Sequence, residues 1–126
     1  MIGLTRKVRV FICLAATDMR KSYDTLAGLV HHEMGGDVLS GDLYLFVGRD
    51  LRRSKVLYFD GTGLCLFQKR LSSGRFSAPW EGADRAVMTQ GELALFLDGS
   101  RQVGRVPRSP PALTEKDMFI SPDAFT

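Results

Sequence analysis

The sequence contains no run of eighteen apolar residues, so it offers no candidate for a membrane-spanning helix. Its first residues also lack the long apolar stretch and cleavage site of a signal peptide, and we expect a cytoplasmic protein with no membrane partner. Cysteine is scarce, and Cys13 and Cys65 each lie in an apolar, strand-like segment. We expect both to be reduced and buried. Two distant cysteines and the pair His31-His32 do not make up a metal site, so no metal or other cofactor is predicted.

Acidic residues are sparse in two parts of the chain. The 126 residues, enough for one domain, carry a net charge of only +3. Residues 1–17 nevertheless hold three basic side chains and no acid, and residues 49–75 hold seven basic side chains and two acids. Clustered positive charge favours phosphate backbones or acidic protein surfaces, although it also occurs on solvated faces that keep a protein soluble.

The first third of the chain predicts a strand followed by a helix. Residues 8–14 are apolar and β-branched, which favours a strand inside a sheet. Apolar residues then recur at helical spacing over Asp18–Met34, with Thr17 or Asp18 as N-cap and Gly35-Gly36 as the stop. The predicted buried face of this helix consists of Met19, Tyr23, Leu26, Ala27, Val30 and Met34.

The middle of the chain predicts an antiparallel β-meander, in which a basic loop, 48–54, joins the first two strands. The tight-turn sequence Asp60-Gly61-Thr62-Gly63 joins the second and third. The fold class is therefore α+β, a mostly antiparallel β-meander sheet packed by two helices. The segments with strand composition are Leu43–Val47, Val56–Phe59 and Leu64–Lys69.

The second helix is predicted near residue 90. Thr89 and Glu92 have the spacing of a capping box, an apolar run follows, and Gly99 ends it. Residues 86–88 are expected to add a short strand. We place the folded domain at 1–100 and a proline-rich, flexible tail at 101–126, in which only Met118-Phe119-Ile120 is a candidate for docking as a patch.

A basic edge follows from the predicted topology. A meander brings its first loop beside the end of its third strand, so the charges of 49–54 should meet those of 69–70. Arg20 and Lys21 lie at the expected helix start, where positive charge is unfavourable by a few tenths to about 1 kcal/mol, so a negative partner explains them better than stability does. The predicted nucleic-acid-binding residues are Arg20, Lys21, Arg49, Arg52, Arg53, Lys55, Lys69, Arg70 and Arg75.

No residue set predicts catalysis, so we expect a protein that is not an enzyme. His31 and His32 have no serine or cysteine motif to serve, and Gly61-Thr62-Gly63 is too short for a phosphate loop. A two-metal nuclease site is the less favoured alternative, because each acid has an ordinary role as a cap, in a turn or in a polar link. The acids in question are Asp18, Asp60, Glu81 and Asp84.

Several segments, in order and spacing over about residues 1–99, resemble the accessory protein of insertion-sequence 66 transposons, known as TnpB or the second open reading frame protein. The departures are Ser22, where the family commonly has glycine, Tyr58-Phe59 in place of a tryptophan pair, and the proline-rich ending. The resembling segments are Met1-Ile2-Gly3-Leu4, 16–21 with Asp24 and Leu26, Ser40-Gly41-Asp42-Leu43, 60–66, Lys69-Arg70-Leu71, Gly74-Arg75-Phe76 and 89–97.

The resemblance implies a role in DNA transposition beside a separate, larger transposase. Two hypotheses follow. In the first, the basic residues contact phosphates of transposon DNA, and binding weakens steeply with salt. In the second, the protein is an interaction module for the transposase with an apolar patch of Phe46, Tyr58 and Phe59, and salt has little effect. Core packing is the ordinary alternative for those aromatic residues.

Overall fold

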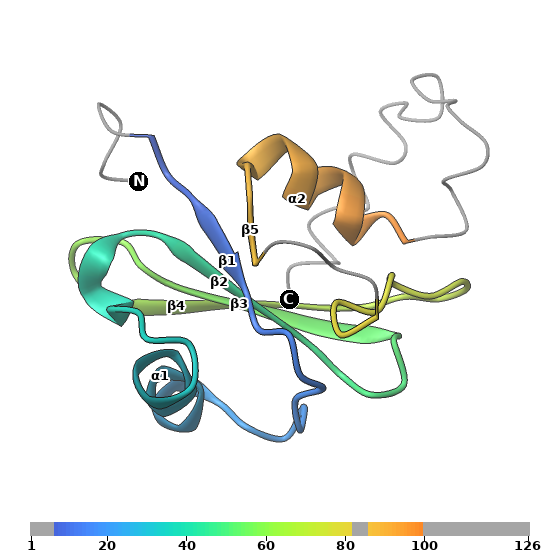
Figure 1. Cartoon of the computed structure of the whole chain (residues 1–126), viewed down its shortest axis with the longest axis horizontal. Coiled ribbons are helices and arrows are strands. Elements are labelled where there is room, and N and C mark those ends of the chain that lie inside the picture. Colours follow the sequence, from blue (N-terminus) through green and yellow to red (C-terminus); the bar gives the residue numbers. More distant parts are fainter. Residues whose placement is uncertain (1–6, 82–85, 100–126) are drawn as a thin grey trace.

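A mixed five-stranded sheet lies between two helices in the computed structural model, which describes residues 7–81 and 86–99 (Figure 1). The strand order is β4-β3-β2-β1-β5; β1 and β2 are parallel, and all other neighbours are antiparallel. Helices α1 and α2 cover opposite faces of the sheet, which confirms the α+β fold class. The strands are β1 Val10–Ile12, β2 Leu43–Val47, β3 Arg53–Phe59, β4 Leu64–Arg70 and β5 Val87–Met88, and the helices are α1 Tyr23–His32, the 3₁₀ turn η1 Val38–Ser40 and α2 Gln90–Leu97.

Helix α1 begins later than the sequence predicts. Its N-cap is Ser22, whose backbone N–H donates to Thr25 Oγ1 over 3.0 Å. Thr17 is unavailable as a cap because it is buried and its N–H donates to Val47 O, which holds the chain extended beside β2. The predicted start at Asp18 is therefore wrong, since a tertiary contact of residue 17 overrides the local capping preference.

The end and the buried face of α1 agree better with the sequence. Gly35 has a φ of 65°, and the Gly36 N–H reaches back to Val30 O over 2.9 Å, as expected for a glycine stop. Leu26 and Val30 are fully buried. Tyr23 is 44% exposed, so its predicted burial is wrong: as the first helical residue it lies at the rim of the apolar face.

The meander is confirmed, with a register that extends β3 to Arg53. Tyr44 pairs with Leu57 across β2 and β3, and Tyr58 pairs with Cys65 across β3 and β4. Side chains alternate between two cores, Leu45 and Val47 facing α2 and Tyr44 and Phe46 facing α1. Phe46 is fully buried, so the predicted apolar contact patch loses it to core packing.

The chain then crosses to the α2 face and completes that core. The Phe76 N–H donates to Leu51 O over 2.7 Å, and the Phe76 ring stacks on Phe96 at 5.3 Å between centroids. The capping box of α2 is formed as predicted, with the Glu92 N–H donating to Thr89 Oγ1 and the Thr89 N–H donating to Glu92 Oε1.

Asp84 and the 101–126 tail, with its Met118-Phe119-Ile120 segment, lie outside the described residues. No helix in 7–81 or 86–99 is long and apolar enough to span a bilayer.

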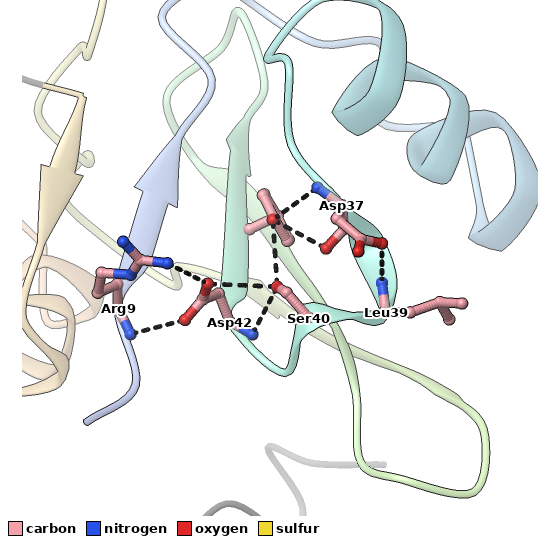
Figure 2. Close-up of polar contacts among 6 residues, drawn as sticks. Arg9, Asp37, Leu39, Ser40 and Asp42 are labelled. Carbon is pink, nitrogen blue, oxygen red and sulfur yellow. Dashed lines mark hydrogen bonds and ion pairs between the residues drawn. The ribbon is translucent and has the colours of Figure 1, made fainter. Parts of the chain in front are cut away.

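A polar cluster joins β1 to the start of β2 (Figure 2). The buried carboxylate of Asp42 accepts hydrogen bonds from the Arg9 backbone N–H and from Arg9 Nη2, each at 3.1 Å. Ser40 Oγ donates to Asp42 and accepts from the Asp42 N–H, and the Tyr44 hydroxyl donates to Asp37 O. The Ser40-Gly41-Asp42 sequence is thus a structural joint for the parallel strand pair.

Candidate nucleic-acid interface

Two basic segments that are far apart in sequence come together at one end of the sheet. The Lys55 ammonium group on β3 donates to Lys21 O over 2.6 Å, and the Thr17 N–H donates to Val47 O over 2.9 Å. Met19 packs so closely on the turn after β2 that a Cβ at Gly48 would lie 2.7 Å from Met19 Cγ. The 17–21 segment is therefore fixed against the basic 48–53 turn.

The 48–53 turn has a defined backbone. The Gly48 N–H donates to Arg53 O and the Leu51 N–H donates to Gly48 O, each over 2.9 Å, while Leu51 has a left-handed φ of 60°. Asp50 Oδ1 accepts from the Arg52 N–H at 3.0 Å and Asp50 Oδ2 accepts from Arg53 Nε at 3.1 Å. These contacts, the Arg52 N–H first, lower the pKa of Asp50 from its usual value, so the carboxylate holds Arg53 in place at neutral pH.

A second acidic residue orients Arg20. Asp18 accepts from the Arg20 N–H at 2.9 Å and from Arg20 Nη2 at 2.8 Å, and these bonds hold the pKa of Asp18 well below its usual range. The Arg20 side chain is 88% exposed, so it keeps donors that face solvent. Asp18 is therefore a turn residue that positions an arginine, and not the helix cap that the sequence suggests.

Six of the nine predicted residues surround this end of the sheet. Arg53 pairs with Arg70 across β3 and β4, and Arg52 Nη2 donates to Ser72 O over 3.2 Å, so the first turn lies beside the end of β4 as the meander argument predicts. Arg49 lies in the exposed part of the turn. We call the following residues the basic surface: Arg20, Lys21, Arg49, Arg52, Arg53 and Arg70.

The other three predicted residues are not part of this surface. Lys55 is only 8% exposed, and its ammonium group is used by Lys21 O. Lys69 is on the opposite face, where its Nζ donates to Leu97 O over 2.7 Å at the end of α2, and burial lowers its pKa. Arg75 is exposed, but its carbonyl oxygen lies beside Gly99, also at the end of α2. Strand alternation alone does not distinguish a buried lysine from a solvated one, which is why the sequence predicts Lys55 and Lys69 as binding residues.

Two of the acids considered for a nuclease site, Asp18 and Asp60, have structural partners. Asp60 Oδ1 accepts from the Thr62 N–H, the Thr62 hydroxyl and the Gly63 N–H, and these bonds lower the pKa of Asp60 to about 2. Burial, and then the nearby Asp60 charge, raises the pKa of the Cys65 thiol, which disfavours the nucleophilic thiolate. Within the described ranges, no three His, Cys, Asp or Glu side chains gather as a metal site would need.

Comparison with known proteins decides the family. Residues 8–105 match the family described as IS66 Orf2-like protein. The chain belongs to this family. Two relatives are the uncharacterized proteins y4hO and y4jC of Sinorhizobium fredii. The protein y4hO is 36% identical over 99 residues, which cover 79% of this chain and 86% of the relative. The protein y4jC is 31% identical over 110 residues, which cover 87% of this chain and 93% of the relative. No solved structure matches. An IS66 Orf2-like protein is an accessory protein associated with transposition, which agrees with the sequence resemblance.

No local sequence signal predicts the contact that holds the basic surface of this IS66 Orf2-like protein together. Lys55 and Lys21 are 34 positions apart, and the bond uses a backbone carbonyl, which carries no residue identity. The parallel pairing of β1 with β2 carries the 17–21 segment to that position. The signal that was available is local: Lys55 directly precedes the apolar run 56–59, so it stands next to a segment that the sequence places in the core.

Proposed function

We propose that this IS66 Orf2-like protein binds the DNA of its transposable element through the basic surface, as a non-catalytic partner of the transposase. The observation that carries the proposal is the meeting of the 17–21 segment and the 48–53 turn, held by Lys55 and Thr17. Five of the six side chains are arginines, whose planar forks suit phosphate oxygens. Asp18 and Asp50 neutralise part of the charge and orient Arg20 and Arg53.

Phosphate contacts would account for the position of the charges. Arg20 and Lys21 precede α1, whose N-terminus is itself partly positive, so positive charges gather where the helix dipole disfavours them. A polyanion can neutralise all the positive side chains of the basic surface in one contact, and it releases its own counterions on binding. Contacts of this kind position a protein on DNA without reading the bases, so we infer a sequence-independent contribution to binding.

The test is a salt titration of binding to a transposon-end duplex and, separately, to the transposase. We expect DNA affinity to fall steeply with salt, and each phosphate contact removed to reduce the slope of log K against log salt by about 0.9. The variants are Arg20→Ala with Lys21→Ala, and Arg49→Ala with Arg52→Ala. Lys7→Ala is the matched control, because Lys7 precedes β1 at the opposite end of the sheet.

Two outcomes would contradict the proposal. One is wild-type protein that does not bind duplex DNA but binds the transposase with little salt dependence, which favours the interaction-module hypothesis. The other is DNA binding that Lys7→Ala weakens as much as the basic-surface variants do. Unfolding should change by only about 0–1 kcal/mol per exposed charge, so lost binding cannot be ascribed to lost fold.

A further inference from the structure

Two arginines of the basic surface face each other across the outermost strand pair. Arg53 opens β3 and Arg70 closes β4, and the two are direct cross-strand partners. Both point to the α1 face, since they stand four residues from Leu57 and Leu66, which pack under α1. Directly opposed residues have Cβ atoms about 4.5–5.5 Å apart, and like charges in this arrangement are destabilising.

The surrounding residues neutralise this pair incompletely. Asp50 Oδ2 takes only the Nε of Arg53, at 3.1 Å, which leaves the outer nitrogens of that guanidinium without a partner among the described residues. The Arg70 side chain makes no hydrogen bond or ion pair with any residue in the described ranges. Lys55 adds a third cation on this face, two residues beyond Arg53, and it is buried with a carbonyl rather than a carboxylate at its ammonium group.

Buried or crowded cations in proteins are normally paired with anions. Here an anion could bind on the solvent side of Arg53 and Arg70, where the two long side chains can converge on one group. Asp50 holds Arg53 by Nε, so the fork formed by its other two nitrogens stays available for an anion. Positive charge continues from this pair to Arg52 and Arg49, so the ligand should be a polymer with repeated charges rather than a single small ion.

We propose that Arg53 and Arg70 jointly bind one phosphodiester group of a nucleic-acid backbone, with the buried Lys55 adding positive potential from its place two residues along β3. This inference rests on the proposed function and makes it specific, because it assigns two arginines to one phosphate. Since the phosphate remains neutralised by either arginine alone, the two side chains should not contribute independently to the salt dependence of binding.

The test uses the full chain and a labelled duplex of arbitrary sequence. Arg53→Ala and Arg70→Ala should each change the salt slope little, whereas the double variant should lose about 0.9, not about 1.8. The double variant Arg53→Lys with Arg70→Lys should keep the slope and bind about tenfold more weakly, because it keeps the charges but loses both forks. Circular dichroism and the unfolding midpoint should match those of the wild type.

The failures of the two proposals are distinguishable. Wild-type protein that binds DNA with a steep slope, and a double alanine variant whose slope is unchanged or falls by about 1.8, overturn the shared phosphate but leave the proposed function intact. Absence of wild-type binding overturns both. A double alanine variant that binds DNA normally but no longer binds polyglutamate would assign the pair to carboxylates of an acidic protein, and the phosphate assignment would be wrong.

Discussion

The ammonium group of Lys55 lies 2.6 Å from the carbonyl oxygen of Lys21, and this bond joins β3 to the segment that precedes α1. Burial of Lys55 lowers its pKa, with a further contribution from the positive charge of Arg53. The folded state therefore disfavours the proton relative to the unfolded chain, and this penalty is present below the folded-state pKa and disappears as pH rises past the unfolded value.

Replacement of Lys55 by methionine should separate stability from binding. Lys55→Met removes a buried charge and one hydrogen bond, so the free energy of unfolding at neutral pH should stay within about 1 kcal/mol of the wild type. The 17–21 segment should lose an anchor, which we expect as faster amide exchange at Lys21 and weaker DNA binding. Lys7→Met is the matched control. Unchanged exchange and binding in Lys55→Met would remove Lys55 from the interface altogether.

Replacement of Lys69 should affect stability and leave DNA binding unchanged, the reverse of what we expect for Lys55. Lys69→Met keeps the apolar stem but leaves Leu97 O without its donor, which should cost about 1 kcal/mol of stability in urea unfolding and increase amide exchange in the last turn of α2. The salt slope of DNA binding should not change, because this side chain lies on the α2 face. A slope reduced by about 0.9 would return Lys69 to the binding residues.

Asp42 should be more important to stability than either lysine. Asp42→Ala leaves the Arg9 N–H and Ser40 Oγ without their shared acceptor, and we expect a loss of about 2–4 kcal/mol, measured by chemical denaturation. Arg9→Met should cost less, because its backbone N–H can still donate to Asp42. Equal losses of unfolding free energy in the two variants would mean that the exposed guanidinium of Arg9, and not the buried carboxylate of Asp42, holds β1 to the start of β2.

Asp60 gives a prediction with a defined pH range. Its folded-state pKa of about 2 is below the ordinary value of 3.8, so its contribution to stability is present above the unfolded-state pKa and is lost as pH falls towards 2. Asp60→Ala should lower the thermal midpoint at neutral pH, and the difference from the wild type should shrink between pH 4 and pH 2. Asp60→Asn, which keeps an acceptor for the Thr62 and Gly63 N–H groups, should cost less. A difference that does not vary with pH would contradict the role of the charge.

Much of the fold follows from local sequence. Apolar spacing predicts the burial of Leu26 and Val30, the Thr89–Glu92 spacing predicts the start of α2, and Asp60-Gly61 predicts the turn between β3 and β4. Each of these features depends on residues within about one helical turn or one hairpin. The position of Arg49 and Arg52 beside the end of β4 also follows, because hairpin topology determines it.

The remainder depends on long-range contacts that the sequence does not encode locally. The start of α1 moves from Asp18 to Tyr23 because Thr17 pairs with β2, and no preference near residue 18 contains that information. Lys55 and Lys69 look like similar strand charges, yet they bond on opposite faces of the sheet, Lys55 to the segment that precedes α1 and Lys69 to the last residue of α2. The parallel β1–β2 pair, which brings Arg20 and Lys21 to the basic surface, likewise depends on a crossover through α1.

The alignment of the strands separates charge along the molecule. The basic surface lies where β2 ends and β3 begins, whereas Glu33, Asp37, Asp42 and Asp60 lie at the opposite ends of α1, β2 and β3. The described residues therefore form an electric dipole parallel to the strands, and α1 adds to it because its positive end points the same way. On the proposed function, the field of a nucleic acid would exert a torque on this dipole, and we expect the protein to turn its arginines towards the nucleic acid before any contact forms. The direction of the sheet would then determine the orientation at encounter, and with it the association rate.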